Sequence, residues 1–185
     1  GASNTDVDGK PLSGLPPQSA VVAAFEVDVT EVTVEAFRRC VAAAACDEAN
    51  LGKEALCNTA RSDHLDHPVN CVPFAQAEAY CRWEGKRLPS EIEWEVAASL
   101  DLPALMPLDF GGEAQNEICL TEEYSSGSTA GPLGTCAVGT RVPKNSKLGL
   151  ADMIGNVSEW TGSHFCDRGT VLCRSRVIRG SAWHG

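Results

Sequence analysis

Residues 148–161 read LGLADMIGNVSEWT, and this stretch contains two carboxylates, two glycines, an amide and a tryptophan. Asp152 and Glu159 are seven positions apart, which is too far for one helical turn but natural for a loop around a hard cation. Such a cation takes carboxylate oxygens together with backbone carbonyls. Gly155 allows the sharp turn that points carbonyls inward, and Trp160 would anchor the loop in the core. The alternative is a buried loop whose acids cap nearby backbone N–H groups, and spacing alone favours this simpler arrangement.

The length and composition of the chain indicate one globular domain. The chain has 185 residues, of which 43% are hydrophobic and 22% charged, and this length can bury a sizeable core. A net charge of −10 argues against a nucleic-acid partner, because binding to phosphates requires clustered Lys and Arg. No apolar run reaches the length of a membrane span.

Cysteine usage indicates an oxidising compartment. Nine cysteines are many for a cytosolic chain, and their spacing is typical of a disulfide framework. We expect Cys119–Cys136 and Cys166–Cys173 to pair, because each bond would close a loop that has no other staple. The partners among Cys40, Cys46, Cys57 and Cys71 cannot be deduced. Structural zinc is the alternative, but the chain has no C-x2-C pair.

Periodicity and capping signals predict few regular elements. Residues 1–18 are rich in Gly, Ser, Asp and Pro and predict a flexible leader. Alternation over residues 20–30 predicts a half-buried strand. Thr33 predicts a helix N-cap, and Ser90 with Glu93 forms a capping box after Pro89. The expected elements are helices over 34–44 and 74–84, a third helix after Pro89, and a strand over 174–183. The second helix is expected to bury Phe74, Ala77 and Cys81, and the third is expected to turn Trp94 and Ala97 inward.

Two polar pairs in the predicted loops could belong to sites, but structural roles are simpler. His64 and His67 form an H-x2-H pattern that could chelate zinc, although Pro68 favours a fixed turn. Lys86 and Arg87 could bind a phosphate, but ion pairs with Glu91 or Glu95 in a solvated turn are the expected arrangement.

Four ordered motifs resemble the formylglycine-generating enzyme (sulfatase-modifying factor) family. Residues 149–160, GLADMIGNVSEW, are similar to the family signature GL-x-DM-x-GNVWEW. Residues 67–69, HPV, and residues 77–95, AEAYCRWEGKRLPSEIEWE, match a second family pattern. EVT at 31–33 and RVIRG at 176–180 fit its opening and closing strands. The resemblance implies an α+β, loop-rich variant of the C-type lectin fold over residues 19–185, with few helices, short strands and disulfide staples.

The resemblance also implies calcium. In the family, the signature loop wraps an ion through side-chain and backbone oxygens, and these positions correspond to Asp152 (side chain), Gly155 and Val157 (carbonyls) and Glu159 (side chain). Hard oxygen ligands favour calcium over zinc or copper. Asn116 stands where the family has a ligand of a first calcium site, whose remaining acids are not identifiable in this sequence.

The copper chemistry of the family is not matched by this chain. Family enzymes oxidise a substrate cysteine to formylglycine with copper held by two cysteines, and soft thiolates suit copper(I). Alignment places Gly185 at the first copper position. We therefore assign no catalytic residue in this chain, and we expect the C-terminal segment of the family to be missing from it. The resemblance also implies that Cys81 is the single thiol, because its family partner lies in that segment.

Three hypotheses follow. The first is a non-catalytic, calcium-stabilised, extracytoplasmic domain that binds a peptide or protein. The second is an oxidoreductase whose copper-binding cysteines are supplied beyond Gly185. The third is a structural module of an envelope protein. We rank binding first on the chemistry of the residues present, because a family name does not establish an activity.

Overall fold

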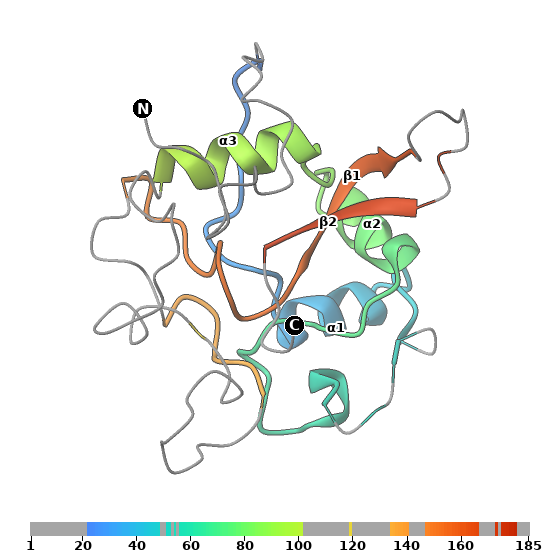
Figure 1. The fold of residues 1–185 in the computed structure, drawn as a ribbon. Coiled ribbons are helices and arrows are strands. Elements are labelled where there is room, and N and C mark those ends of the chain that lie inside the picture. Colours follow the sequence, from blue (N-terminus) through green and yellow to red (C-terminus); the bar gives the residue numbers. More distant parts are fainter. Residues whose placement is uncertain are drawn as a thin grey trace, which may run out of the picture.

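The computed structural model describes residues 22–48, 51–52, 54, 56–101, 119, 134–140, 147–166, 173 and 175–180. These residues form a loop-rich α+β domain, as expected (Figure 1). The described elements are α1 (Val34–Ala42), the 3-10 turn η2 (Asn58–Ala60), α2 (Phe74–Trp83), α3 (Glu91–Asp101), β1 (Glu159–Phe165) and β2 (Ser175–Arg179). The expected leader, Asn116 and Gly185 lie outside the described residues.

Helices α1 and α3 begin where their capping residues predict. The Thr33 Oγ1 accepts a hydrogen bond from Ala36 N–H at 3.0 Å, which satisfies one of the free donors of the first turn of α1. Before α3, Ser90 and Glu93 exchange hydrogen bonds of 2.7 and 3.2 Å between side chain and backbone. The predicted capping box is therefore confirmed.

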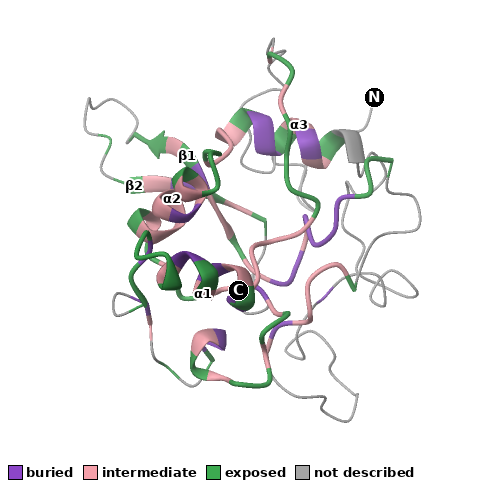
Figure 2. Ribbon diagram, turned by 180° about the vertical axis from the view of Figure 1, so that it is seen from behind, coloured by how far each residue is buried: buried purple, intermediate pink, exposed green. Residues whose placement is uncertain are grey.

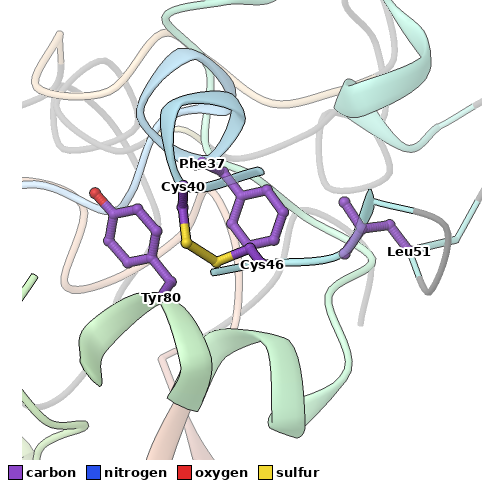
Figure 3. Packing of buried hydrophobic residues seen from close by; sticks show 5 residues of the cluster. All are labelled: Phe37, Cys40, Cys46, Leu51 and Tyr80. Atoms are coloured by element: carbon purple, nitrogen blue, oxygen red, sulfur yellow. A yellow bond between two sulfur atoms is a disulfide. The ribbon is translucent and has the colours of Figure 1, made fainter. Parts of the chain in front are cut away.

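The first core cluster lies between α1 and α2 and is closed by a disulfide (Figure 3). Phe37 is 1% exposed and stacks on Tyr80 of α2, with ring centroids 6.0 Å apart. The Cys40–Cys46 disulfide lies beside them. Full burial of a side chain such as Phe37 contributes about 1.5–3 kcal/mol. In α2 it is Tyr80 that is buried, at 8% exposed, whereas the expected core residues Phe74, Ala77 and Cys81 are partly buried.

The second core cluster joins α3 to the loop after residue 148. Trp94 and Ala97, predicted to face inward, are 7% and 2% exposed and pack with Leu150 and Met153. Figure 2 shows the buried positions of α3 and of this loop. This cluster places the 152–159 loop against the interior face of α3.

Strands β1 and β2 form an antiparallel pair whose ends pair Glu159 with Arg179 and Phe165 with Ser175. The pairing is irregular between Trp160 and His164. In both ribbon views α2 lies beside this pair (Figures 1 and 2). Phe74 of α2 meets the Trp160 ring edge-on at 5.8 Å.

The predicted half-buried strand over residues 20–30 is wrong for the part that the structure describes. Residues 22–28 form no strand there, and Val27 and Val29 are 38% and 53% exposed. A strand requires a neighbour to accept its ladder hydrogen bonds, and no described segment pairs with these residues. The Val29 carbonyl instead accepts one hydrogen bond, from Ala151 N–H at 2.9 Å.

The expected ion pairs of the turn after α2 are also wrong. Lys86 binds Asp28 at 2.8 Å, and Arg87 makes a two-pronged contact with Glu93 at 2.6 and 2.7 Å. Glu91 and Glu95 pair with Arg179 instead. Glu91 and Glu95 are thus held by β2, a segment distant in sequence.

Candidate metal site

The 152–159 loop is tightly wound. Asp152, Gly155 and Asn156 have φ angles of 59°, 91° and 56°, in the left-handed region that glycine, Asn and Asp tolerate best. Gly180, directly after β2, has a φ of 75°, at which a side chain would strain the backbone. A Cβ there would lie in ordinary van der Waals contact with the loop, 3.5 Å from the Val157 carbonyl oxygen, so the loop packs against the end of β2.

The two predicted carboxylate ligands are brought together. Asp152 is 4% exposed, and its Oδ2 accepts a hydrogen bond from Gly139 N–H at 2.9 Å. Glu159 Oε2 accepts from the Trp94 indole Nε1–H at 2.7 Å. Burial raises the pKa of Glu159 to about 7, and the charge of Asp152 acts in the same direction, although the Trp94 hydrogen bond opposes it.

A third carboxylate, Glu31, joins this pair from the segment before α1. Burial, with the charges of Asp152 and Glu159, raises the pKa of Glu31 from its ordinary 4.5 to about 9. Its Oε1 is shielded from solvent and has no hydrogen-bond partner among the described residues. Sequence reasoning missed Glu31, because it stands in the EVT motif with no pattern that marks it as a site residue.

Asn156 orients this arrangement. It is 0% exposed; its N–H donates to Cys119 O at 2.8 Å and its Oδ1 accepts from Cys136 N–H at 3.0 Å. The opposite end of the amide, Nδ2, donates to Glu31 Oε2 at 3.1 Å. The Cys119–Cys136 disulfide therefore staples the backbone that holds Asn156. Because Asn156 is fully buried, its formal N-x-S sequon is not presented to solvent.

The oxygen atoms of this loop suit a hard divalent cation. Carboxylates at Asp152 and Glu159, with carbonyls of a left-handed loop, are the ligand types that calcium accepts. The shielded Glu31 Oε1 adds an acceptor that a cation would satisfy. A buried carboxylate is costly unless it is paired, protonated or bound to metal, and the charges that act on Glu31 and Glu159 are those of other carboxylates.

The cysteines do not fit a copper site within this chain. The structure describes all nine, and eight form the pairs Cys40–Cys46, Cys57–Cys71, Cys119–Cys136 and Cys166–Cys173. Cys81 is the remaining thiol, and burial raises its pKa. A site made of two thiolates would need a second thiol from elsewhere. Glu54 approaches Cys57 and Cys71 within 4.8 Å, but the disulfide leaves those sulfurs without thiolate character.

The two loop histidines serve the structure of the loop. Their rings stack with centroids 3.9 Å apart, and His67 Nδ1 lies 2.8 Å from Thr135 Oγ1. Asn58 Nδ2 donates to that same hydroxyl and to Pro68 O, both at 2.8 Å. Burial lowers the pKa of His67, with the charge of His64 as the next cause. This network ties the turn to a distant segment.

A cavity of about 530 Å³ is lined in part by Glu31 and Glu159. Residues 24–28, which form no strand, line one wall, and Trp94, Trp160, Cys81 and Lys86 are among the others. Cavities of this size, with mostly apolar walls and a few polar groups, hold ligands in many proteins. Among the described residues, no helix is both long and apolar enough to cross a membrane.

Comparison with known proteins agrees with the motif assignment. The family model for the sulfatase-modifying factor enzyme 1-like domain matches residues 2–185, so the chain belongs to the formylglycine-generating-enzyme (sulfatase-modifying factor) family.

Individual relatives differ in activity. The chain is 38% identical over 125 residues to the inactive C-alpha-formylglycine-generating enzyme 2 of Bos taurus, covering 65% of this chain and 40% of that protein. It is 40% identical over 111 residues to the formylglycine-generating enzyme of Mycobacterium tuberculosis, covering 56% and 36%. It is 34% identical over 136 residues to the hercynine oxygenase of Mycolicibacterium smegmatis, covering 64% and 31%. The matches thus span two fifths or less of each relative.

Proposed function

We propose that this domain is a non-catalytic, calcium-stabilised binding module on the C-type-lectin variant of its family, and that it works outside the cytoplasm. The observation that supports calcium most directly is the convergence of Asp152, Glu159 and Glu31. Burial raises the pKa of Glu31 and Glu159, so in the absence of a proton the site favours a cation. The ligand set is the Asp152 and Glu159 side chains with the Gly155 and Val157 carbonyls; Asn116 belongs to a separate proposed site.

Calcium should stabilise the fold measurably. An ion that binds the folded state alone contributes about 2.7 kcal/mol at a hundredfold excess over Kd. We expect the melting temperature to fall when a chelator replaces millimolar calcium, and Asp152→Ala or Glu159→Ala to remove this sensitivity. Glu78→Ala, at an exposed pair with Arg82, is the control and should keep it. If the wild type melts identically in both buffers and elemental analysis finds no metal, the loop is a capped turn.

The cysteine chemistry supports a non-catalytic role. Eight of nine thiols are committed to disulfides, which leaves Cys81 without a second thiolate for copper(I). One of the similar proteins is an inactive formylglycine-generating enzyme 2. The same four disulfides support an oxidising, extracytoplasmic location.

The cavity supports binding of a peptide or protein. Residues 24–28 form one of its walls and have the backbone and alternation that an added strand could use. Peptides selected from a random library against the folded domain should protect the amides of residues 24–28 from hydrogen exchange. Binders that protect only other segments would show that the ligand surface lies elsewhere.

The second candidate is a sulfatase-modifying oxidoreductase that converts a substrate cysteine to formylglycine with copper from a segment beyond Gly185. The 40% identity to the Mycobacterium tuberculosis formylglycine-generating enzyme favours it, and the match spans 36% of that protein. Incubation of this chain with copper(I), oxygen and a Cys-x-Pro-x-Arg peptide should leave the peptide mass unchanged. An aldehyde mass shift would overturn the non-catalytic proposal.

A further inference from the structure

Glu31 is placed at the calcium loop by backbone hydrogen bonds on both sides of it. Two residues before it, Val29 O accepts from Ala151 N–H at 2.9 Å, and one residue after it, Val32 O accepts from Val69 N–H at 2.8 Å. Ala151 directly precedes Asp152, so the first bond brings Glu31 to the start of the loop. The backbone position of Glu31 is thus fixed on both sides.

The orientation of the Glu31 carboxylate is also determined. Asn156 Oδ1 accepts from Cys136 N–H, which identifies Nδ2 as the donor end of the amide. Nδ2 donates to Glu31 Oε2 at 3.1 Å and to Cys136 O at 3.4 Å. Oε2 is therefore engaged. Oε1 is shielded from solvent with no hydrogen-bond partner among the described residues, which leaves an unmet acceptor beside two other carboxylates.

The proposed calcium ligands also leave room for another. Calcium takes six to eight oxygens, whereas the loop offers two carboxylates and two carbonyls. We propose that Glu31 supplies a third carboxylate to this calcium site through Oε1, and that Asn156 is the residue that positions it. This inference rests on the proposed calcium function. It also means that the cation joins the 152–159 loop to the segment that lines the cavity, because Glu31 lies in that wall.

The test is calcium titration by isothermal calorimetry on the full chain with its disulfides intact. Glu31→Gln keeps the shape and the acceptor for Asn156 but removes the charge. Its Kd for calcium should rise by about ten- to a hundredfold, the range seen when groups that tune a metal site are lost. Glu35→Gln, at an exposed position in the first turn of α1, is the matched control and should change Kd less than about twofold.

A second readout separates a ligand from a structural residue. In chelator, Glu31→Gln should melt at or above the wild type, because it removes one of three neighbouring carboxylates that repel one another. In calcium it should melt below the wild type. Equal shifts in both buffers would mean that Glu31 acts only on the fold.

The outcomes also distinguish this inference from the calcium proposal. Calcium binding by the wild type with an unchanged Kd in Glu31→Gln overturns the role of Glu31 and leaves the loop site standing. Absence of calcium binding by the wild type overturns both. If Glu31→Gln does not fold, Glu31→Asp takes its place: the shorter carboxylate should bind more weakly, and a wild-type Kd would contradict the inference.

Discussion

Two glutamates near Trp94 have opposite electrostatic environments. At the start of α3, Glu93 contacts Arg87 and the Ser90 backbone, and the Arg87 hydrogen bond is the main cause that lowers the pKa of Glu93 to about 2. In the 152–159 loop, burial raises the pKa of Glu159 to about 7. A buried carboxylate with a guanidinium partner is stable as an anion, whereas one among other carboxylates needs a proton or a metal ion. The Arg87–Glu93 pair is therefore complete within the capping turn, whereas we expect the loop to need a proton or a bound cation.

The largest expected effect tests whether Trp94 links the two environments. Trp94→Ala should cost about 3–5 kcal/mol in urea unfolding, because it removes a buried aromatic side chain. It should also diminish the calcium-induced rise in melting temperature, since Glu159 loses its indole donor. Phe37→Ala, in the other core cluster, should cost a similar amount and leave the calcium effect intact. Equal loss of the calcium effect in both variants would contradict a local role for Trp94.

The next effect concerns the staple behind the loop. Replacing both Cys119 and Cys136 with Ala should cost about 3 kcal/mol from the lost 17-residue closure, measured by urea unfolding. Calcium should also bind more weakly in calorimetry, because the backbones of both cysteines hold Asn156. The Cys166–Cys173 double variant, with a separation of 7, should cost about 2 kcal/mol and bind calcium normally. Normal calcium binding by both variants would show that the Cys119–Cys136 disulfide does not support the calcium site.

The smallest effect concerns the capping turn before α3, where Arg87 pairs with Glu93. Arg87→Ala should cost about 1–2 kcal/mol at pH 7, because Glu93 loses its charged partner and part of the pair is exposed to solvent. The folded pKa of Glu93 lies below its ordinary 4.5, so its stabilisation is complete above about pH 4.5 and is lost as pH falls toward 2.

The corresponding measurement is the melting temperature between pH 2 and 6. The wild type should lose more stability over this interval than Arg87→Ala. Arg82→Ala, which removes an exposed pair with Glu78, should cost no more than about 0.5 kcal/mol and keep the wild-type acid profile. Parallel profiles for wild type and Arg87→Ala would mean that Arg87 does not set the pKa of Glu93.

Local signals predicted the elements that depend on neighbours in sequence. The Thr33 cap, the Ser90–Glu93 box and the inward positions of Trp94 and Ala97 involve residues three or four apart, and such contacts form in any helix that starts there. The strand over residues 20–30 was wrong, because alternation shows that a segment can pair but not that a neighbour is present. The partners of Lys86 and Arg87 were wrong because ion-pair choice depends on which distant segments fold beside them.

The sequence by itself determined the family, through four ordered motifs, and the loop with Asp152, Gly155, Val157 and Glu159, because those residues share one contiguous stretch. Tertiary structure alone decided that Glu31 joins them. Nothing local to Glu31 marks it as buried: its environment comes from the Val29–Ala151 hydrogen bond and from the Asn156 amide, 125 positions away. The burial and the charge of a site depend on every segment that packs there, whereas a sequence motif describes only one of those segments.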